Sequence, residues 1–455
     1  MKKFDFIIIG SGQAGVPLAF SLSKKGTVAL IEKSFLGGTC VNNGCVPTKA
    51  YVASARRIWD SLHGEEMGIE IPAGAKANLE KIKARKDTLV KGSREGIEKS
   101  ISSNDKITLF RGEAHFISNY EIAINDDKIT AKQIFINVGA RAIIPKEFSK
   151  VDYLTNVEIL ELAKLPEHLI IIGGSYIGLE FGQMFKRFGT KVTIIESGDR
   201  LISKEDENVS DAIATILQEE NIAIEFNAKE INVTQDGTKI LLKINGADKE
   251  ITGTHLLLAV GRAPNTDTLQ LENTSIMYDE EGYITVDDYC KTNTAGIFAI
   301  GDCNGKGAFT HTSYNDFQIV EEYILGDEKR KISDRITTYG LFIDPPLGRV
   351  GMTKAEAKEK GFSILIGQRP MDKIGRAKEK GETKGFMEAI IDAKTNQFLG
   401  ACVLGVGGDE IISGITNLMY AKQPYTIFRD AIHIHPTVSE LIPTMLEDLQ
   451  PTTKE

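Results

Sequence analysis

An apolar run that ends at closely spaced glycines opens the chain. The run Phe4–Ile9 leads into Gly10-Ser11-Gly12-Gln13-Ala14-Gly15, a helical pattern follows from Val16 to Lys24, and a second apolar run ends at Glu32. A strand, a Gly-x-Gly-x-x-Gly turn, a helix and a strand that ends at an acid form a dinucleotide-binding βαβ unit. We predict that Gly10, Gly12 and Gly15 let a pyrophosphate approach the helix N-terminus. Glu32 would then accept hydrogen bonds from a ribose.

The same pattern recurs in the middle of the chain. The run Leu169–Ile172 precedes Gly173-Gly174-Ser175-Tyr176-Ile177-Gly178, and the later run Lys191–Ile195 ends at Glu196. Ser175 replaces the middle glycine, which slightly weakens the prediction of a pyrophosphate site. Two such units imply two dinucleotides, and the simplest interpretation is one cofactor that stays and one that visits.

Glu196 bears on which nicotinamide nucleotide visits. A carboxylate at this position favours the free 2′-hydroxyl of NADH and repels the 2′-phosphate of NADPH. Arg200 and Lys204 follow closely and leave NADPH open. The competing interpretation is that Glu196 is only a surface residue at a strand end.

Two cysteines five residues apart follow the first glycine pattern. Cys40 and Cys45 lie in Gly37-Gly38-Thr39-Cys40-Val41-Asn42-Asn43-Gly44-Cys45-Val46-Pro47-Thr48-Lys49. Positions five apart on a regular helix point away from each other, so these two can pair only across a distorted turn. Asn42, Asn43 and Gly44 are residue types that permit one. A structural disulfide would stabilise little across so short a loop, and the zinc alternative lacks ligand-spaced partners, so we expect a redox dithiol.

Three further segments end at residues that could face a cofactor. We interpret the apolar runs that end at Gly139 and Gly261 as the closing strands of the two nucleotide domains. A third run delivers Asp302 to a sheet edge, where it could bind a polyol. The helical pattern after Phe309 would place a helix N-terminus, with its partial positive charge, near an electron-accepting ring.

The last third of the chain changes character near Arg335. Strands such as Phe398–Leu404 alternate with helices such as Asp409 to Ala421. A histidine with a carboxylate five residues later, His435 and Glu440, could be a base and the group that orients it. His433 has a less suitable spacing.

Composition narrows the classes of partner and location. The chain has 455 residues and a net charge of −9, which argues against nucleic acid. No apolar run is long enough to span a bilayer, so we expect no membrane partner and a cytoplasmic location. We also expect no metal site, a solvated helix from Lys81 to Lys99, and a frayed tail from Gln450 to Glu455.

Taken together, these residues resemble the flavin-dependent pyridine nucleotide–disulfide oxidoreductases over nearly the whole chain. The resemblance implies an α/β protein with two Rossmann-like dinucleotide-binding domains, for FAD and NAD(P), and an α+β C-terminal dimerisation domain. The domain limits would be 1–148 with 268–334 for FAD, 149–267 for NAD(P)H, and 335–455 for dimerisation. It also implies a homodimer whose active site is shared between subunits, and a part in cell redox homeostasis.

The resemblance also implies roles for single residues. Cys45 would be the charge-transfer thiol next to the flavin and Cys40 the interchange thiol that meets the substrate. Lys49 and Glu180 would form an ion pair near flavin N5, and His435 with Glu440 would serve the other subunit. The implied FAD contacts are Gly10, Gly12, Gly15, Glu32, Gly38, Thr39, Lys49, Gly139, Asp302 and Thr310, and the implied NAD contacts are Gly173, Gly174, Gly178, Glu196 and Gly261.

The branch of the family is left open by the sequence. Thr48 and Phe309-Thr310-His311-Thr312 look more like mercuric reductase, whereas His435 and Glu440 look like dihydrolipoamide dehydrogenase. The main hypothesis is an NADH-linked oxidoreductase, with NADPH possible, that acts on a small or protein-bound disulfide or dithiol. The alternative is a reductase of Hg(II) or Cu(II) that uses both cysteines as soft ligands. A non-enzymatic flavin-binding redox sensor is a third, weaker hypothesis.

Overall fold

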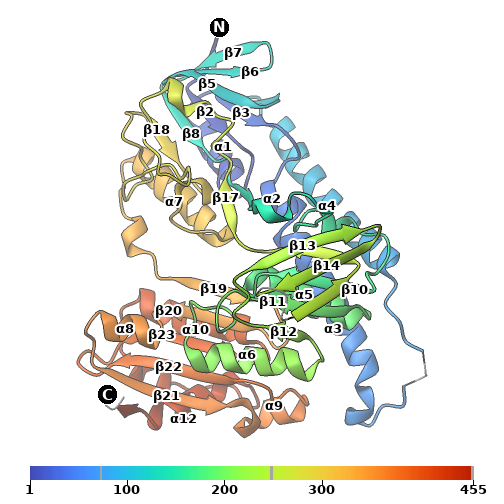
Figure 1. The fold of residues 1–455 in the computed structure, drawn as a ribbon. Helices are drawn as coiled ribbons and strands as arrows, with labels where there is room; N and C mark the ends of the chain where they lie inside the picture. Colours follow the sequence, from blue (N-terminus) through green and yellow to red (C-terminus); the bar gives the residue numbers. More distant parts are fainter. Residues whose placement is uncertain (72–73, 246–248, 452–455) are drawn as a thin grey trace. The chain divides into compact units, whose positions relative to one another are not determined.

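The computed structural model describes residues 1–71, 74–245 and 249–451, and the chain forms two compact units. Unit 1 contains Met1–Ala50, Lys83–Ile143 and Gly261–Arg335, and unit 2 contains Tyr51–Ile82, Ile144–Val260 and Ile336–Glu455. Figure 1 shows both units in sequence colours. Each unit is described by itself below.

Unit 1 is built around a five-stranded parallel sheet. Its strands, in spatial order, are β18 (Ile297–Ala299), β8 (Gln133–Ile136), β2 (Phe6–Ile9), β3 (Val28–Glu32) and β4 (Ile107–Arg111). In chain order this is 5-4-1-2-3, the order of a Rossmann sheet, in which ligands bind where the order reverses. That point lies between β2 and β8, where the Gly10 turn leaves the sheet.

The two faces of this sheet pack against different layers. Ile7 and Ile9 share a core with Phe116, Ile122 and other residues of a four-stranded sheet. That sheet contains β1 (Lys2–Lys3), β7 (Asp127–Thr130), β6 (Glu121–Ile124) and β5 (Ala114–Ser118). Phe6 and Ile8 point the other way, because side chains alternate along a strand. They pack in a second core with residues of α1 (Gly15–Ser23), α4 (Leu79–Ser102) and α7 (Thr310–Leu325).

Unit 2 contains a second sheet of the same design. The order is β12 (Ala223–Glu225), β11 (Lys191–Ile195), β10 (His168–Ile172) and β16 (His255–Leu258), all parallel. Leu169 and Ile171 pack with residues of α5 (Tyr176–Phe188) and α6 (Glu207–Glu219). Ile170 and Ile172 pack against the antiparallel strands β13 (Ile231–Asp236), β14 (Lys239–Ile244) and β15 (Lys249–Gly253), which Figure 1 shows as a separate sheet.

The rest of unit 2 holds a six-stranded antiparallel sheet with short helices. Its order is β19 (Thr338–Leu341), β20 (Leu347–Gly351), β23 (Phe398–Leu404), β22 (Phe386–Asp392), β21 (Ile364–Pro370) and β24 (Gln450–Pro451). The helices are α8 (Lys354–Glu359), α9 (Gly375–Glu379), α10 (Gly408–Tyr420), α11 (Thr426–Asp430) and α12 (Ile442–Glu447). This mixture of helices and strands has the α+β character that the sequence predicts after Arg335.

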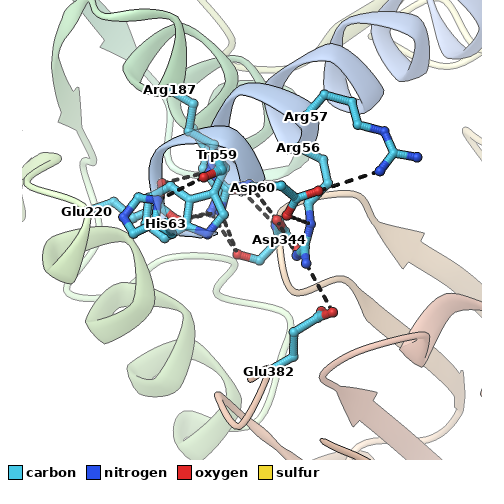
Figure 2. A network of polar contacts seen from close by, with 10 residues as sticks. Arg56, Arg57, Trp59, Asp60, His63, Arg187, Glu220, Asp344 and Glu382 are labelled. Atoms are coloured by element: carbon cyan, nitrogen blue, oxygen red, sulfur yellow. Dashed lines mark hydrogen bonds and ion pairs between the residues drawn. The ribbon is translucent and has the colours of Figure 1, made fainter. Parts of the chain in front are cut away.

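The helix α3 (Cys45–Leu62) begins in unit 1, but from Tyr51 onward it belongs to unit 2. Figure 2 shows why: Arg56 bonds to Asp344 at 2.8 Å and to Glu382 at 3.0 Å. The buried Arg187 bonds to Glu220 at 2.7 Å, also pairs with Asp344, and lies 4.3 Å from the ring centre of Trp59. Tyr51 and Ala55 of the same helix join the core beneath α5.

Two expectations from the sequence are wrong in part. The Lys81–Lys99 stretch is helical, as predicted, but it is not fully solvated, because the side chain of Lys86 is only 2% exposed. Gln450 and Pro451 are not frayed: they pair with Ile366 and Leu365 at a sheet edge. The rest of the predicted tail lies outside the described residues.

Candidate active site

The two cysteines of the sequence pattern lie together in unit 1. The short helix α2 (Gly38–Asn42) carries Cys40, and α3 begins at Cys45, so the helix is broken between them as the sequence predicts. Asn43 makes the break, with φ −151° and ψ 28°. Both cysteines are thiols. A hydrogen bond with Cys45, together with burial, raises the pKa of the Cys40 thiol well above its usual range, although a hydrogen bond with Thr310 and the Lys49 ammonium oppose this.

Two helix N-termini meet at Cys45. The residue is the first of α3, and its sulfur lies 3.2 Å from the hydroxyl of Thr310, which is the first residue of α7. The Thr312 hydroxyl bonds back to the residue before α7: it accepts the Phe309 N–H at 3.1 Å and donates to the Phe309 carbonyl at 2.7 Å. Helix N-termini carry partial positive charge, which stabilises a thiolate.

The first and last glycines of the first glycine turn have no room for a side chain. Gly10 has φ +104°, and a Cβ there would lie 2.3 Å from the carbonyl oxygen of Asn137. A Cβ on Gly15 would lie 2.2 Å from the Gly10 oxygen, and one on Gly38 would lie 2.8 Å from the Gly12 Cα. The turn is therefore packed between β8 and the segment that carries Cys40. Its bare backbone at the start of α1 suits a pyrophosphate.

Glu32 lies where a ribose acid is expected, at the end of β3. Its Oε2 accepts the Ser11 N–H at 3.0 Å and the Ser11 hydroxyl at 2.6 Å, and its Oε1 accepts the Ser34 N–H at 2.8 Å. These bonds fix the carboxylate beside the glycine turn.

Asp302 follows β18 at the same edge of the sheet. Its contacts with other side chains are long: 3.4 Å to the Ser313 hydroxyl and 3.6 Å to the Arg262 guanidinium. Burial raises the pKa of Asp302, and Arg262 opposes this. A half-buried carboxylate with such weak bonds retains capacity to accept hydrogen bonds from a polyol chain. Gly139, with φ +67°, has open space beside its Cα.

The second glycine turn, in unit 2, repeats the design. Gly173 has φ +111°, and a Cβ there would lie 2.4 Å from the Ala259 oxygen; a Cβ on Gly178 would lie 2.0 Å from the Gly173 oxygen. Glu196 accepts the Gly174 N–H at 2.8 Å and the Gly198 N–H at 2.7 Å. Gly261 belongs to unit 1, with φ +135°, so the structure assigns it to the other unit from the remaining predicted NAD contacts.

Arg200, one of the two basic residues that could bind the 2′-phosphate of NADPH, lies close to two acidic side chains. Arg200 lies 3.4 Å from Asp199 and 3.6 Å from Glu207. A guanidinium with two carboxylates nearby is less suited to a 2′-phosphate than one without them.

His435 and Glu440 lie together in unit 2. The His435 Nδ1 is 3.1 Å and 3.0 Å from the two Glu440 oxygens, and the imidazole is 82% exposed. His433 instead contacts the Phe428 carbonyl at 2.9 Å through Nε2 and stacks on the Phe428 ring. Glu180 is buried on α5 and accepts the Phe342 N–H at 3.0 Å. Lys49 and Glu180 are in different units, so their ion pair stays a prediction.

The sequence analysis missed Asn137 and Ser11. Besides lying against Gly10, Asn137 donates its side-chain amide to the Gly10 oxygen at 3.2 Å. A single asparagine inside the apolar run that reaches Gly139 was the available signal. Among the described residues, no group of three or more His, Cys, Asp or Glu side chains could hold a metal ion. No described helix is both long and apolar enough to cross a membrane.

Comparison with known proteins decides the family. Residues 4–316 match the model of the pyridine nucleotide-disulphide oxidoreductases, and residues 337–446 match the dimerisation domain of the same family. The chain belongs to this family. Membership confirms the predicted α/β fold and an enzyme that links a pyridine nucleotide to a disulfide or dithiol through a flavin.

Similar proteins fall into three branches of the family. The chain is 36% identical to the probable pyridine nucleotide-disulfide oxidoreductase RclA of Escherichia coli (strain K12), over 97% of this chain and 98% of that protein. It is 33% identical to mercuric reductase of Staphylococcus aureus (91% and 76%) and 30% identical to dihydrolipoyl dehydrogenase of Bacillus subtilis (strain 168) (96% and 94%). A solved Cu(II) complex of the HOCl-induced flavoprotein disulfide reductase RclA matches with a TM-score of 0.90 and 35% identity, over 98% and 99% of the chains.

Proposed function

We propose that the enzyme moves electrons between NADH and a small or protein-bound disulfide or dithiol, through FAD and the Cys40–Cys45 pair. The observation that carries the proposal is the geometry at Cys45, where two helix N-termini meet beside the Cys40 thiol. Bound FAD and nicotinamide supply the two-electron chemistry that links the nucleotide to the thiols. The domain limits and site residues given above are part of this proposal.

The chain's own groups carry out the thiol exchange. The Cys40 sulfur attacks a substrate disulfide, forms a mixed disulfide and releases one substrate thiol; the Cys45 sulfur then attacks Cys40 and releases the second. This leaves a Cys40–Cys45 disulfide, so the substrate gains two electrons and the enzyme loses two. Because the pKa of Cys40 is raised, its thiol holds a proton that must be removed before attack. His435 of the partner subunit, oriented by Glu440, is the proposed base.

A second copy of the chain is the proposed partner of the C-terminal region. Ile432 and Ile434 are 101% and 80% exposed, next to the exposed His435. A homodimer would cover these apolar side chains and bring His435 to the thiols of the other subunit. We place this dimer in the cytoplasm.

NADH is the proposed nucleotide. Glu196 is fixed by two backbone N–H groups at the end of β11, and Arg200 is paired with acids. Measurement of kcat/KM for both nucleotides tests this; a clear preference for NADPH would refute it.

One observation favours a second candidate, reduction of Cu(II) or Hg(II). A similar solved structure is a Cu(II) complex, and mercuric reductases are among the relatives. Two adjacent thiols are soft ligands suited to such ions. Family membership weighs against the third hypothesis of a sensor without activity.

Steady-state assays of the flavin-loaded protein with lipoamide, glutathione disulfide, Hg(II) and Cu(II) test the two candidates. We expect disulfide turnover that is lost in both Cys40→Ser and Cys45→Ser. On addition of NADH, Cys40→Ser should keep a long-wavelength absorbance band and Cys45→Ser should lose it. Turnover of metal ions alone would replace the main proposal with the second candidate.

A further inference from the structure

The segment that carries Cys40 has little regular structure of its own. Helix α2 has five residues, and its N-cap, Gly37, makes no side-chain capping bond. Helices this short are not stable by themselves in water. Other contacts must therefore hold Cys40 in place.

The side chain of Asn42 provides one such contact. Its Nδ2 lies 2.8 Å from the Gly38 oxygen, 3.0 Å from the Leu36 oxygen and 3.3 Å from the Phe35 oxygen. The side-chain amide of Asn42 thus connects the end of α2 to its first residue and to the segment that precedes it. The loop and the helix are held as a closed turn around Asn42.

Arg94, on α4, connects this turn to the rest of unit 1. Its Nε donates to the Asn42 Oδ1, and its guanidinium lies 3.8 Å from the centre of the Phe35 ring. Phe35 itself is 57% exposed, so it has few other contacts to fix it. The planar guanidinium is suited to both roles at once, because it donates a directed hydrogen bond and stacks on an aromatic face.

We propose that Arg94 is a positioning residue for the redox pair, which clamps Asn42 and Phe35 and so fixes Cys40 relative to Cys45. The proposal rests on the proposed function, in which the Cys45 sulfur must reach Cys40 in the mixed disulfide. Disulfide formation needs the two Cβ atoms within about 4 Å and a defined dihedral angle. A small displacement of α2 therefore slows this step strongly.

The test uses Arg94→Met in the flavin-loaded enzyme, because Met keeps much of the stem and loses the charge and the donor. The matched control is Lys91→Met on the same helix, since the Lys91 side chain is exposed and lies 3.7 Å from Glu95, one turn away. We expect disulfide turnover to fall about tenfold in Arg94→Met, by loss of alignment. Reduction of the flavin by NADH and the flavin content should match the control.

Alkylation of Cys40 separates positioning from general stability. In the NADH-reduced enzyme, iodoacetamide should label Cys40 several times faster in Arg94→Met than in Lys91→Met, as read by mass spectrometry. Arg94→Lys keeps the charge near Phe35 but not the planar fork, so its rates should lie between those of Arg94→Met and the wild type. A labelling rate equal to that of the control, or an equal loss in both half-reactions, would overturn the proposal.

The two proposals can fail separately. If the wild type turns over no disulfide, the proposed function fails, and the labelling of Cys40 still decides whether Arg94 positions it. If the wild type is active and only the thermal stability of Arg94→Met changes, Arg94 has a purely structural role.

Discussion

The two glycine turns are alike in their backbone and different in what covers them. Gly10 and Gly173 have nearly the same φ, +104° and +111°, and each lies against a carbonyl of the neighbouring strand. In the first turn, a Cβ on Gly38 would lie 2.8 Å from the Gly12 Cα. The segment that carries Cys40 therefore packs closely against the middle glycine. In the second turn, Ser175 takes the middle place in an extended conformation, with φ −115° and ψ −170°.

The two turns thus differ in what packs beside them: the backbone of Gly38 lies beside the first turn, whereas a Cβ on Gly174 in the second turn would lie 2.6 Å from the Leu201 side chain. The sequence interpretation treated Ser175 as a weakness of the nucleotide site, whereas the structure accommodates its side chain. We expect the first turn, which the segment with the redox cysteines covers, to hold the cofactor that stays, and the second turn to hold the one that exchanges. The cover also places the thiols of unit 1 beside the first site.

The largest effect should come from breaking the thiol chemistry while both turns stay intact. His435→Gln removes the proposed base for the Cys40 thiol, and loss of a general base typically costs about 10²–10⁴-fold. Disulfide turnover should fall by that factor, whereas NADH should still reduce the flavin. Stopped-flow measurement of the two half-reactions checks this. Glu440→Gln should lose less, because Glu440 only orients the imidazole; unchanged turnover in His435→Gln would remove that residue from the mechanism.

The next effect tests the comparison directly by exchanging the middle residues of the turns. Gly12→Ser should crowd Asn137, because a Cβ on Gly12 would lie 3.2 Å from the Asn137 side-chain nitrogen, and overpacking of this kind costs about 1–3 kcal/mol, or roughly 10–100-fold in FAD affinity. Ser175→Gly, the reverse change in the second turn, should alter nucleotide binding much less, because it only removes a side chain. Titration of apoprotein with FAD, and of holoenzyme with NADH, gives both numbers. Equal sensitivity of the two turns would mean that the cover is not what distinguishes them.

The sequence predicts the strands better than the packing between them. The strands 191–195 and 398–404 occur at the predicted residues, because apolar runs that end at glycines or acids mark buried strands clearly. Both glycine turns and the break between Cys40 and Cys45 follow from local residue types. The pairing of Gln450 and Pro451 was missed, because two polar-flanked residues at a sheet edge have no periodicity to reveal them.

Contacts between residues far apart in the chain limit how much of the site the sequence can predict. Arg94 bonds to Asn42 across 52 positions, and Arg262 approaches Asp302 from another strand. Nothing in the local pattern around Arg94, in a lysine-rich helix, distinguishes it from solvated neighbours. The residues proposed to perform the chemistry can thus be recognised in the sequence, whereas those proposed to position them cannot.

A smaller effect concerns the acids that end the second strands, Glu32 and Glu196. Glu196→Arg should shift the ratio of kcat/KM toward NADPH by about tenfold, because an arginine gains a charge-assisted bond to the 2′-phosphate. Because Glu32, not Glu196, is the acid proposed for the FAD site, Glu196→Arg should leave FAD content unchanged, which is the control. A preference that does not move would show that Glu196 is only a strand-end residue.

The smallest effect is a difference in acid sensitivity between the two parallel sheets. In unit 1, Phe6 begins β2 beside Gln133 at the start of β8; in unit 2, the corresponding strands β10 and β16 begin at His168 and His255.

Burial lowers the pKa of both histidines. For His168 the Thr252 carbonyl, at 2.7 Å from Nδ1, opposes this lowering of the pKa without cancelling it, and the Thr193 hydroxyl lies 2.9 Å from Nε2.

The sign of the pH dependence follows from these lowered pKa values. Below about pH 6.5 the unfolded chain takes up protons that the folded histidines resist, so stability that is fully present above this pH is lost as the pH falls. Hydrogen exchange at pH 7.5 and 5.5, corrected for intrinsic rates, should show more loss of protection in β10 and β16 than in β2 and β8. His168→Gln with His255→Gln should reduce the difference, and equal loss in both sheets would contradict it.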